Sequence, residues 1–276
     1  MRGLSFCLAL CPASFMGETT RMTASVRNLS EIGSWHVNDK VEVLLAEFSA
    51  RGLVFLEGIE KAEVLLQTLS PLGTVYYHRD SLANGLTHVS TSASGLECAG
   101  DEGRLGFTQD GLTPHTDRSG TEDPPNALAF WIERQAAISG ASLFVDGFAL
   151  FEEMSCRFPA ELVALCRPKS AIFKSEKGFI ESSVFSTVGE SLQVRFRFDQ
   201  LMFLSPEAAK AVEIMLPVLR QLSLQRRLRA GQGYLIDNMR WLHGRTHFVG
   251  DRSAYRLLLS TGNENKAHTE PSVAVH

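Results

Sequence analysis

The pattern of apolar and polar positions opens with a helix, a strand and a second helix. Around 41–48, apolar residues recur every three or four positions, which predicts a helix with Asp39 as its cap. The unbroken apolar run 52–56 predicts a buried strand. A second short helix is expected over 60–69, where Pro71 ends it. This unit is suited to buttress a β-rich core.

Two longer helices with clear start signals are expected further along the chain. The apolar runs 127–132 and 141–145 predict strands, and Asp146 directly after them can cap an amphipathic helix. Ser205, followed by proline and glutamate, is a second helix start. Apolar residues repeat at helical spacing beyond it, although Pro217 should kink or split this helix.

Residues 194–199 alternate strictly between apolar and polar, which predicts a strand. Its apolar face would seal the core, while Arg195, Arg197 and Asp199 share the opposite face. The two arginines could hold an acidic substrate group. A self-neutralising surface ladder with Asp199 fits the same pattern equally well.

Residues 76–103 carry no sustained apolar pattern and are rich in Ser, Gly, Thr and Asn. A loop of this length in a compact domain is usually functional, so we expect a lid over a binding site. His78 and His88 are then possible substrate contacts. A solvent-facing role is the alternative for each histidine.

The strands outnumber the helices and do not alternate with them regularly. Further strands are expected at 234–236 and 257–259. This order favours a mainly β fold with flanking helices, an antiparallel barrel rather than a doubly wound parallel sheet. With 276 residues and 44% hydrophobic content, the chain can bury one substantial core. We therefore expect a single domain over 25–276 and a disordered or over-annotated extension over 1–24, for which a secretion signal is the alternative.

Charge and composition exclude several kinds of partner. A net charge of −4 argues against a general nucleic-acid surface, which would need clustered cations. No stretch reaches the roughly 18 consecutive apolar residues of a membrane span. The five cysteines are too scattered for a disulfide framework, which indicates free thiols in a reducing, cytoplasmic compartment.

The candidate metal chemistry centres on His115 and Asp117. These residues lie two apart, so on an extended strand both side chains share one face. His243, from a distant predicted strand, could complete a two-histidine, one-carboxylate triad, the ligand set of non-haem iron(II) oxygenases. Arg256 opens the next predicted strand and would suit an acidic co-substrate bound beside the metal.

In these motifs the chain resembles the TauD/TfdA branch of the iron(II)- and 2-oxoglutarate-dependent oxygenases, over roughly Arg51 to Thr261. The resemblance implies a double-stranded β-helix of the jelly-roll kind. It also implies that Fe(II) is held by His115, Asp117 and His243.

The resemblance assigns the 2-oxoglutarate site as well. Arg256 is similar in place to the family's arginine that binds the distal carboxylate of 2-oxoglutarate. The family's Gly-Gly-x-Thr segment falls on residues 139–142, so Ser142 would supply the helping hydroxyl in place of threonine. The first glycine of that segment is here Ser139.

The resemblance further implies the reaction. Dioxygen and 2-oxoglutarate would be converted with release of succinate and CO2, coupled to oxidation of a C–H bond of a small molecule. Asp117 occupies the ligand place that halogenating relatives leave to chloride, which favours hydroxylation. Natural-product biosynthesis is the expected setting, with catabolic oxidation of a small organic acid as the alternative. From the residues alone, a zinc hydrolase with the same triad and a silent binding module both stay open.

Several polar residues are candidates for substrate contact: Arg118, Arg195, Arg197, Asn238, Arg240 and His88. Relatives that act on sulfonates or amino-acid carboxylates often carry a second arginine four positions after the clamp, where this chain has Ser260. We therefore expect a neutral or weakly charged substrate unless a candidate arginine supplies the cation. Asn238 could instead orient His243 or close a turn. The oligomeric state is left open by the sequence.

Overall fold

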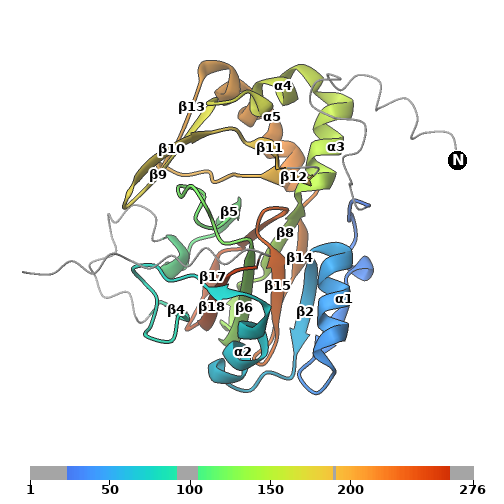
Figure 1. Ribbon diagram of the computed structural model, residues 1–276, viewed down its shortest axis with the longest axis vertical. Coiled ribbons are helices and arrows are strands. Elements are labelled where there is room, and N and C mark those ends of the chain that lie inside the picture. Colours follow the sequence, from blue (N-terminus) through green and yellow to red (C-terminus); the bar gives the residue numbers. More distant parts are fainter. Residues whose placement is uncertain (1–23, 92–104, 189–190, 262–276) are drawn as a thin grey trace, which may run out of the picture.

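Two β-sheets form the framework of the computed structural model, which describes residues 24–91, 105–188 and 191–261 (Figure 1). The larger sheet has, in spatial order, β1 (Ser34–His36), β2 (Leu53–Glu57), β15 (Gly233–Asp237), β6 (Ala127–Arg134), β18 (Ser253–Ser260) and β3 (Thr74–Val75), and β4 (Thr87–Ser90) also pairs with β18. The smaller sheet has the order β14 (Leu224–Arg226), β8 (Ser142–Asp146), β16 (Trp241–Arg245) and β5 (Leu112–His115). Within these two sheets only β1 and β2 pair in parallel.

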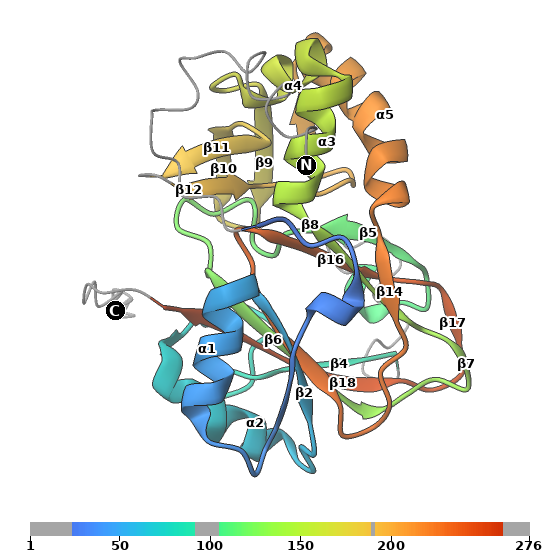
Figure 2. The same cartoon turned by 90° about the vertical axis from the view of Figure 1, so that its right-hand side faces the viewer.

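An apolar layer lies between the two sheets. The ring of Phe144, from the smaller sheet, packs edge-on against Phe55 and Tyr234 of the larger one, with centroids 5.7 and 4.9 Å apart. Trp241 and Leu128 belong to the same buried cluster. The two sheets therefore face each other across one core (Figure 2).

Helices α1 (Val41–Arg51) and α2 (Ala62–Leu69) pack with the larger sheet through a second buried cluster. Both helices and the strand between them were predicted and are confirmed. Asp39 as the cap of α1 is wrong: the helix follows Lys40 without a side-chain cap, because the Asp39 carboxylate accepts a hydrogen bond from the backbone N–H of His36 instead.

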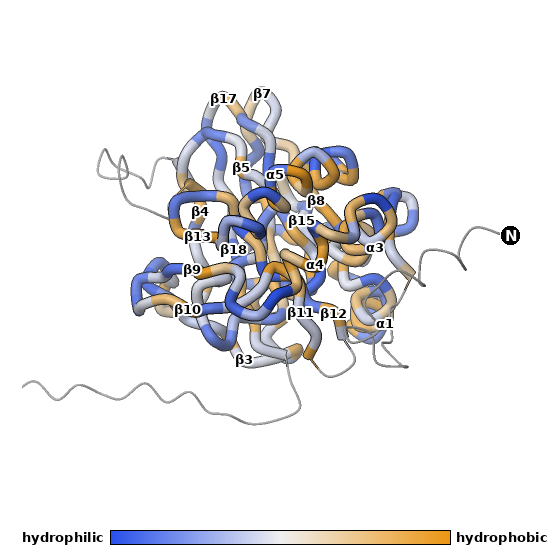
Figure 3. Tube along the Cα trace, turned by 90° about the horizontal axis from the view of Figure 1, so that it is seen from above, coloured by the Kyte–Doolittle hydropathy of each residue, from blue (hydrophilic) through white to orange (hydrophobic). Residues whose placement is uncertain are grey.

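Helices α3 (Gly147–Arg157), α4 (Pro159–Cys166) and α5 (Pro206–Gln221) pack together at the other end of the molecule, where apolar stretches of the chain gather (Figure 3). The predicted caps are confirmed: Asp146 accepts from the N–H of Phe148, and Ser205 accepts from the N–H of Ala208. Helix α5 is not split at Pro217, because the residues on both sides of the proline are buried in the cluster.

Three small sheets complete the fold. They are formed by β9 (Ala171–Ser175), β10 (Gly178–Ser182) and β13 (Met202–Leu204), by β11 (Phe185–Val188) and β12 (Ser191–Val194), and by β7 (Ile138–Ser139) and β17 (Phe248–Val249). Short 3-10 helices occur at Leu29–Glu31, Ser70–Leu72 and Leu105–Phe107, labelled η2, η3 and η5.

Two sequence-based expectations about segments are corrected. A strand was expected over 194–199, but the observed strand β12 ends at Val194, so residues 195–199 do not form a strand. The backbone of Phe196 bonds to Thr116 instead of to a neighbouring strand. The loop expected over 76–103 contains β4, which pairs with β18; its residues 92–104 lie outside the described part of the chain. The expected extension 1–24 also lies outside it, except for its last residue.

The structure confirms a mainly β fold with flanking helices. Among the described residues, strand pairing does not close either sheet into a barrel. No helix in the same residues combines the length and the apolar content needed to cross a membrane. Cys156 is disulfide-bonded, so the expectation of free thiols is wrong at that position.

A buried ion pair connects the turn between β15 and β16, which carries Arg240, to Asp146, the residue that caps α3. Arg240 donates to both carboxylate oxygens of Asp146 at 2.9 and 2.7 Å, and the two side chains are 5% and 0% exposed. The backbone N–H of Val26 donates to the same carboxylate at 2.7 Å, and the guanidinium lies over the Phe148 ring at 4.3 Å. The pair therefore anchors the described start of the chain.

We expect Arg240→Ala to lower the free energy of unfolding by about 3–5 kcal/mol, because it leaves the Asp146 carboxylate buried without its cation. Urea unfolding followed by circular dichroism measures this loss. Arg27→Ala, which removes an exposed pair with Glu152, is the control and should cost about 0.2–1 kcal/mol. A loss in Arg240→Ala no larger than in the control would contradict the assignment.

Candidate metal centre

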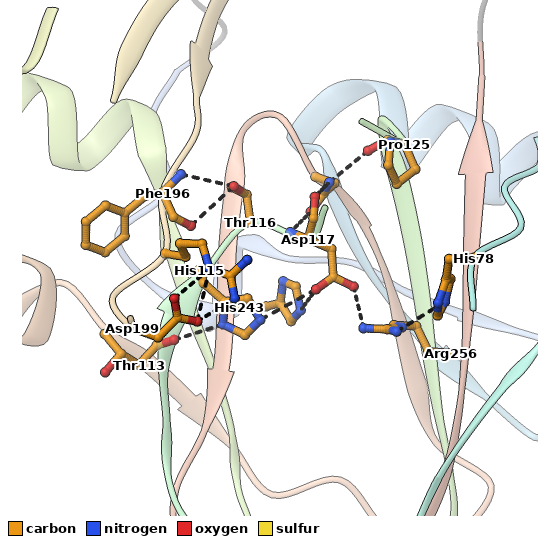
Figure 4. A network of polar contacts seen from close by, with 12 residues as sticks. His78, Thr113, His115, Thr116, Asp117, Pro125, Phe196, Asp199, His243 and Arg256 are labelled. Atoms are coloured by element: carbon orange, nitrogen blue, oxygen red, sulfur yellow. Dashed lines mark hydrogen bonds and ion pairs between the residues drawn. The ribbon is translucent and has the colours of Figure 1, made fainter. Parts of the chain in front are cut away.

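Pairing of β5 with β16 places His115 directly opposite His243. Their ring centroids lie 4.6 Å apart, and Asp117 follows two residues after His115. Asp117 Oδ1 lies 3.5 Å from His115 Nε2 and 3.8 Å from His243 Nε2 (Figure 4). One ligand atom from each residue falls within 4.8 Å of the others. The structure thus brings together the three residues that the sequence nominated as metal ligands.

The loop that carries Asp117 is held from behind by Asn238. Its side-chain carbonyl accepts from the Asp117 N–H at 2.8 Å, and its amide N–H₂ donates to the carbonyls of Asp117 at 3.0 Å and Pro125 at 2.7 Å. Asn238 is fully buried and does not line the pocket described below. Asn238 therefore holds the backbone of Asp117, and its hydrogen bonds to Asp117 and Pro125 give it a structural task instead of a place on the pocket wall.

The ring nitrogens are arranged as a divalent metal would require. His115 Nδ1 lies 2.9 Å from the carbonyl oxygen of Thr113, which can only accept, so Nδ1 carries a proton and Nε2 is the nitrogen left to face the cluster. Burial, and after it the neighbouring His115, lowers the pKa of His243 to about 3, so the His243 ring is neutral. Imidazole nitrogens placed in this way suit a transition metal.

The carboxylate of Asp117 is ionised. Burial acts to raise its pKa, but Arg256 and, after it, the neighbouring histidines outweigh burial and hold the pKa well below its ordinary value. The cluster therefore offers one carboxylate and two imidazole nitrogens to a cation. This donor set fits Fe(II) in a facial triad.

A pocket of about 450 Å³ opens onto the cluster, a size suited to a small-molecule ligand. Arg252 lines it and is only 3% exposed, with its guanidinium 5.2 Å from the Phe130 ring centre and 5.7 Å from that of Phe248. Within the described residues Arg252 has no anionic partner, and its buried Nε has no hydrogen bond. Burial lowers its pKa to about 10, so the group is still cationic at neutral pH.

Tyr234 and Ser142 line the same pocket and are 2% and 3% exposed. The Tyr234 ring lies 6.4 Å from the ring of His243. Burial raises its pKa, so the phenol keeps its proton and can donate. A buried cation and two hydroxyl groups on one pocket lining are suited to a carboxylate ligand.

Arg256 also lines the pocket but is already paired. Its Nη1 donates to Asp117 Oδ2 at 2.8 Å, and its Nη2 lies 3.3 Å from His78 Nε2. The sequence nominated Arg256 to bind a co-substrate carboxylate. In the structure its nearest carboxylate is the metal-ligand candidate itself.

The other candidate substrate cations differ in position. Arg118 and Arg197 line the pocket, and each is paired, with Glu176 at 2.6 Å and with Asp199 at 2.5 Å. The remaining three candidates lie off the pocket lining and are held elsewhere: Arg195 donates to backbone carbonyls of residues 119–122, Arg240 pairs with Asp146, and His88 contacts Ser253 at 2.8 Å and stacks on Tyr255.

Sequence reasoning missed Arg252 and Tyr234. The signal for Arg252 was present, because it lies four residues before Arg256, and residues four apart on an extended segment share a face. The sequence-based prediction considered a second arginine only at the position four residues after Arg256, which is Ser260. Arg245 donates to the backbone carbonyls of Leu105, Gly106, Thr108 and Asp110 and so fixes the pocket wall.

A comparison with protein families matches residues 17–261 to "Taurine catabolism dioxygenase TauD, TfdA family". No curated protein sequence matches the chain significantly.

Solved structures share its fold at low sequence identity. Asparagine oxygenase in complex with Fe(II), 3-hydroxyasparagine and succinate is 14% identical, with a TM-score of 0.65 over 80% of this chain and 78% of that one. PvcB from Pseudomonas aeruginosa is 15% identical, with a TM-score of 0.61 over 89% and 94%. The non-heme iron oxygenase OrfP, in complex with Fe, succinate and (3S)-hydroxy-L-Arg, is 15% identical, with a TM-score of 0.62 over 80% and 81%.

Proposed function

The chain belongs to the TauD/TfdA family of dioxygenases, and on this premise we propose that it is an Fe(II)- and 2-oxoglutarate-dependent dioxygenase that oxidises a C–H bond of a small molecule, by hydroxylation in the first place. The observation that carries the proposal is the meeting of His115, Asp117 and His243 at a pocket. We further propose that the two facing sheets are the halves of a double-stranded β-helix, within one domain over 25–276.

Fe(II) bound to the two histidines and Asp117 would supply oxygen activation, with 2-oxoglutarate decarboxylated to succinate and CO2. The chain's own part is to hold the ion on one side only. His115, Asp117 and His243 would hold the ion at the pocket, where it would stay accessible to a 2-oxo acid and to dioxygen. The bond from His115 Nδ1 to Thr113 keeps that ring turned toward the ion.

For the distal carboxylate of 2-oxoglutarate, we assign Arg252, together with the hydroxyls of Ser142 and Tyr234 on the same pocket lining. The support is the buried guanidinium without an anionic partner, which a carboxylate would neutralise through two parallel hydrogen bonds. Arg256 was the sequence-based prediction for this role, and its ion pair with Asp117 argues against it. Ser142 stays in the assignment.

For the second substrate, we propose a neutral or weakly charged small molecule. Arg118 and Arg197 are the candidate substrate cations on the pocket lining, and both are neutralised by carboxylates. Asparagine oxygenase and OrfP were crystallised with hydroxylated amino acids, and PvcB is described as part of an isonitrile synthetic pathway. The pathway named for PvcB supports our proposal of natural-product biosynthesis, with catabolic oxidation as the alternative. The cytoplasmic location stays a prediction.

We expect succinate to form from 2-oxoglutarate only when Fe(II) and dioxygen are both present, with a higher rate when a substrate fits the pocket. Anaerobic loading with Fe(II), admission of oxygen and quantification of succinate by mass spectrometry measure this. The Zn(II)-loaded protein is the control and should form none, because zinc has no redox chemistry. Hydrolytic turnover that persists with zinc and without oxygen would replace the proposal with a zinc hydrolase.

A further inference from the structure

The two oxygens of the Asp117 carboxylate have different partners. Oδ1 faces the two histidine nitrogens at 3.5 and 3.8 Å, as a ligand atom would. Oδ2 points the other way and accepts a hydrogen bond from Arg256 Nη1 at 2.8 Å (Figure 4). The Asp117 side chain is 7% exposed and the Arg256 side chain 19%, so solvent screens this pair only weakly.

Arg256 is itself held in place from its far side. Its Nη2 lies 3.3 Å from His78 Nε2, which in turn lies 2.9 Å from the hydroxyl of Thr87. Burial, and after it the charge of Arg256, lowers the pKa of His78 to about 4, so this imidazole is neutral and does not repel the guanidinium. Thr87 on β4 is also the register partner of Arg256 on β18. The strand pairing and the buried imidazole together fix where the guanidinium can be.

We propose that Arg256 is a positioning residue of the metal centre: it holds Oδ2 of Asp117 so that the carboxylate binds the metal through Oδ1 alone. This inference rests on the proposed function, because it presupposes a metal on His115, Asp117 and His243. A carboxylate can bind a cation through one oxygen or through both. With Oδ2 engaged by Arg256, the second mode is blocked, and the coordination position it would occupy stays open for the 2-oxo acid or dioxygen.

The arrangement divides two tasks between arginines that lie four residues apart. Arg252 has no anionic partner among the described residues and is assigned to the co-substrate. Arg256 forms an ion pair with the carboxylate of Asp117. A change at Arg256 should therefore alter the ligand field of the metal even before 2-oxoglutarate is added. A change at Arg252 should weaken 2-oxoglutarate binding and leave the ligand field of the metal without co-substrate as it is.

The test uses Co(II) in place of Fe(II), because its visible absorption reports coordination number and geometry without turnover. Arg256→Gln is compared with Arg256→Lys and with the matched control Arg252→Gln, each loaded with Co(II) and titrated with 2-oxoglutarate. We expect Arg256→Gln to change the Co(II) spectrum before 2-oxoglutarate is added. Its Fe(II)-dependent 2-oxoglutarate turnover should fall by about 10- to 100-fold, the usual effect of altering a group behind a ligand.

Arg256→Lys, which keeps the cation beside Oδ2, should give a spectrum close to the parent's. Arg252→Gln should keep the parent's Co(II) spectrum and lose 2-oxoglutarate affinity. An unchanged Co(II) spectrum in Arg256→Gln overturns the proposal, whether 2-oxoglutarate binding is then lost or kept. If the parent forms succinate yet Arg256→Gln behaves in this way, the proposed function stands and only this inference fails.

A structure of the Co(II)-loaded parent protein decides the same point without a variant, should Arg256→Gln not fold. We expect one Asp117 oxygen on the metal and Arg256 within hydrogen-bond distance of the other. Both carboxylate oxygens on the metal, or Arg256 turned away from Asp117 to a bound 2-oxoglutarate, would overturn it. A parent that holds no Co(II) at these three residues would overturn both this inference and the proposed function.

Discussion

His243→Ala is expected to abolish Fe(II) binding and 2-oxoglutarate turnover together. The change removes one of the three candidate protein ligands and leaves an empty space on the pocket lining where the imidazole was. Altering a group behind a ligand already costs roughly 10- to 100-fold in affinity or activity, so loss of a ligand itself should cost more. His115→Ala is expected to behave in the same way, because its Nε2 is the second nitrogen of the cluster.

Metal content after gel filtration and succinate release measure the two effects. His88→Ala is the matched control: it removes an imidazole that contacts Ser253 and lies off the pocket lining, so metal content and turnover should stay at the parent's level. Thermal unfolding of each variant separates loss of the ligand from loss of the fold. Full iron content and turnover in His243→Ala would remove the metal assignment.

Arg252→Met should have two effects of opposite sign. It removes the cation that we assign to the distal carboxylate of 2-oxoglutarate, and truncating one partner of a buried charge pair costs about 2–5 kcal/mol, or roughly 30-fold to 5,000-fold in affinity. In the protein without ligand, however, Arg252 is a buried cation without an anionic partner in the described residues. Its replacement by an apolar side chain should therefore raise the free energy of unfolding.

The two effects are measured separately. Anaerobic titration of the Fe(II)-loaded protein gives the affinity for 2-oxoglutarate, and urea unfolding of the ligand-free protein gives the stability. Arg252→Lys keeps the charge but not the planar fork, so its affinity should lie between those of the parent and Arg252→Met. Weaker 2-oxoglutarate binding together with lower stability would show that Arg252 supports the fold instead.

The parts of the fold that follow from local rules could be predicted from the sequence. The caps of α3 and α5 depend on one side chain and the next backbone N–H groups, and both were found at Asp146 and Ser205. Asp39 failed as a cap because its carboxylate bonds to His36 instead. The strand expected over 194–199 failed because alternation does not fix the partner of the backbone. Of its three apolar positions, Val194 and Phe196 are buried, whereas Phe198 is 50% exposed.

The candidate site divides in the same way. That His115, Asp117 and His243 come together was foreseeable from spacing and the family resemblance, whereas the choice between Arg252 and Arg256 was not. Spacing places both arginines on one face, and only the folded structure shows which one already has a carboxylate beside it. Asn238 was a substrate candidate for its position near His243, and burial behind the Asp117 loop gives it a different task.

The turn between β15 and β16 helps to position all three candidate metal ligands. The side chain of Asn238, in this turn, hydrogen-bonds to both the backbone N–H and the backbone carbonyl of Asp117. His243 follows five residues later on β16, and its pairing with His115 sets the position of His115. The turn therefore positions Asp117 and His243 directly, and it positions His115 through the pairing of β5 with β16. If the two sheets move relative to each other, the three ligand groups should move together. The distances among them would then stay constant while the pocket widens or narrows.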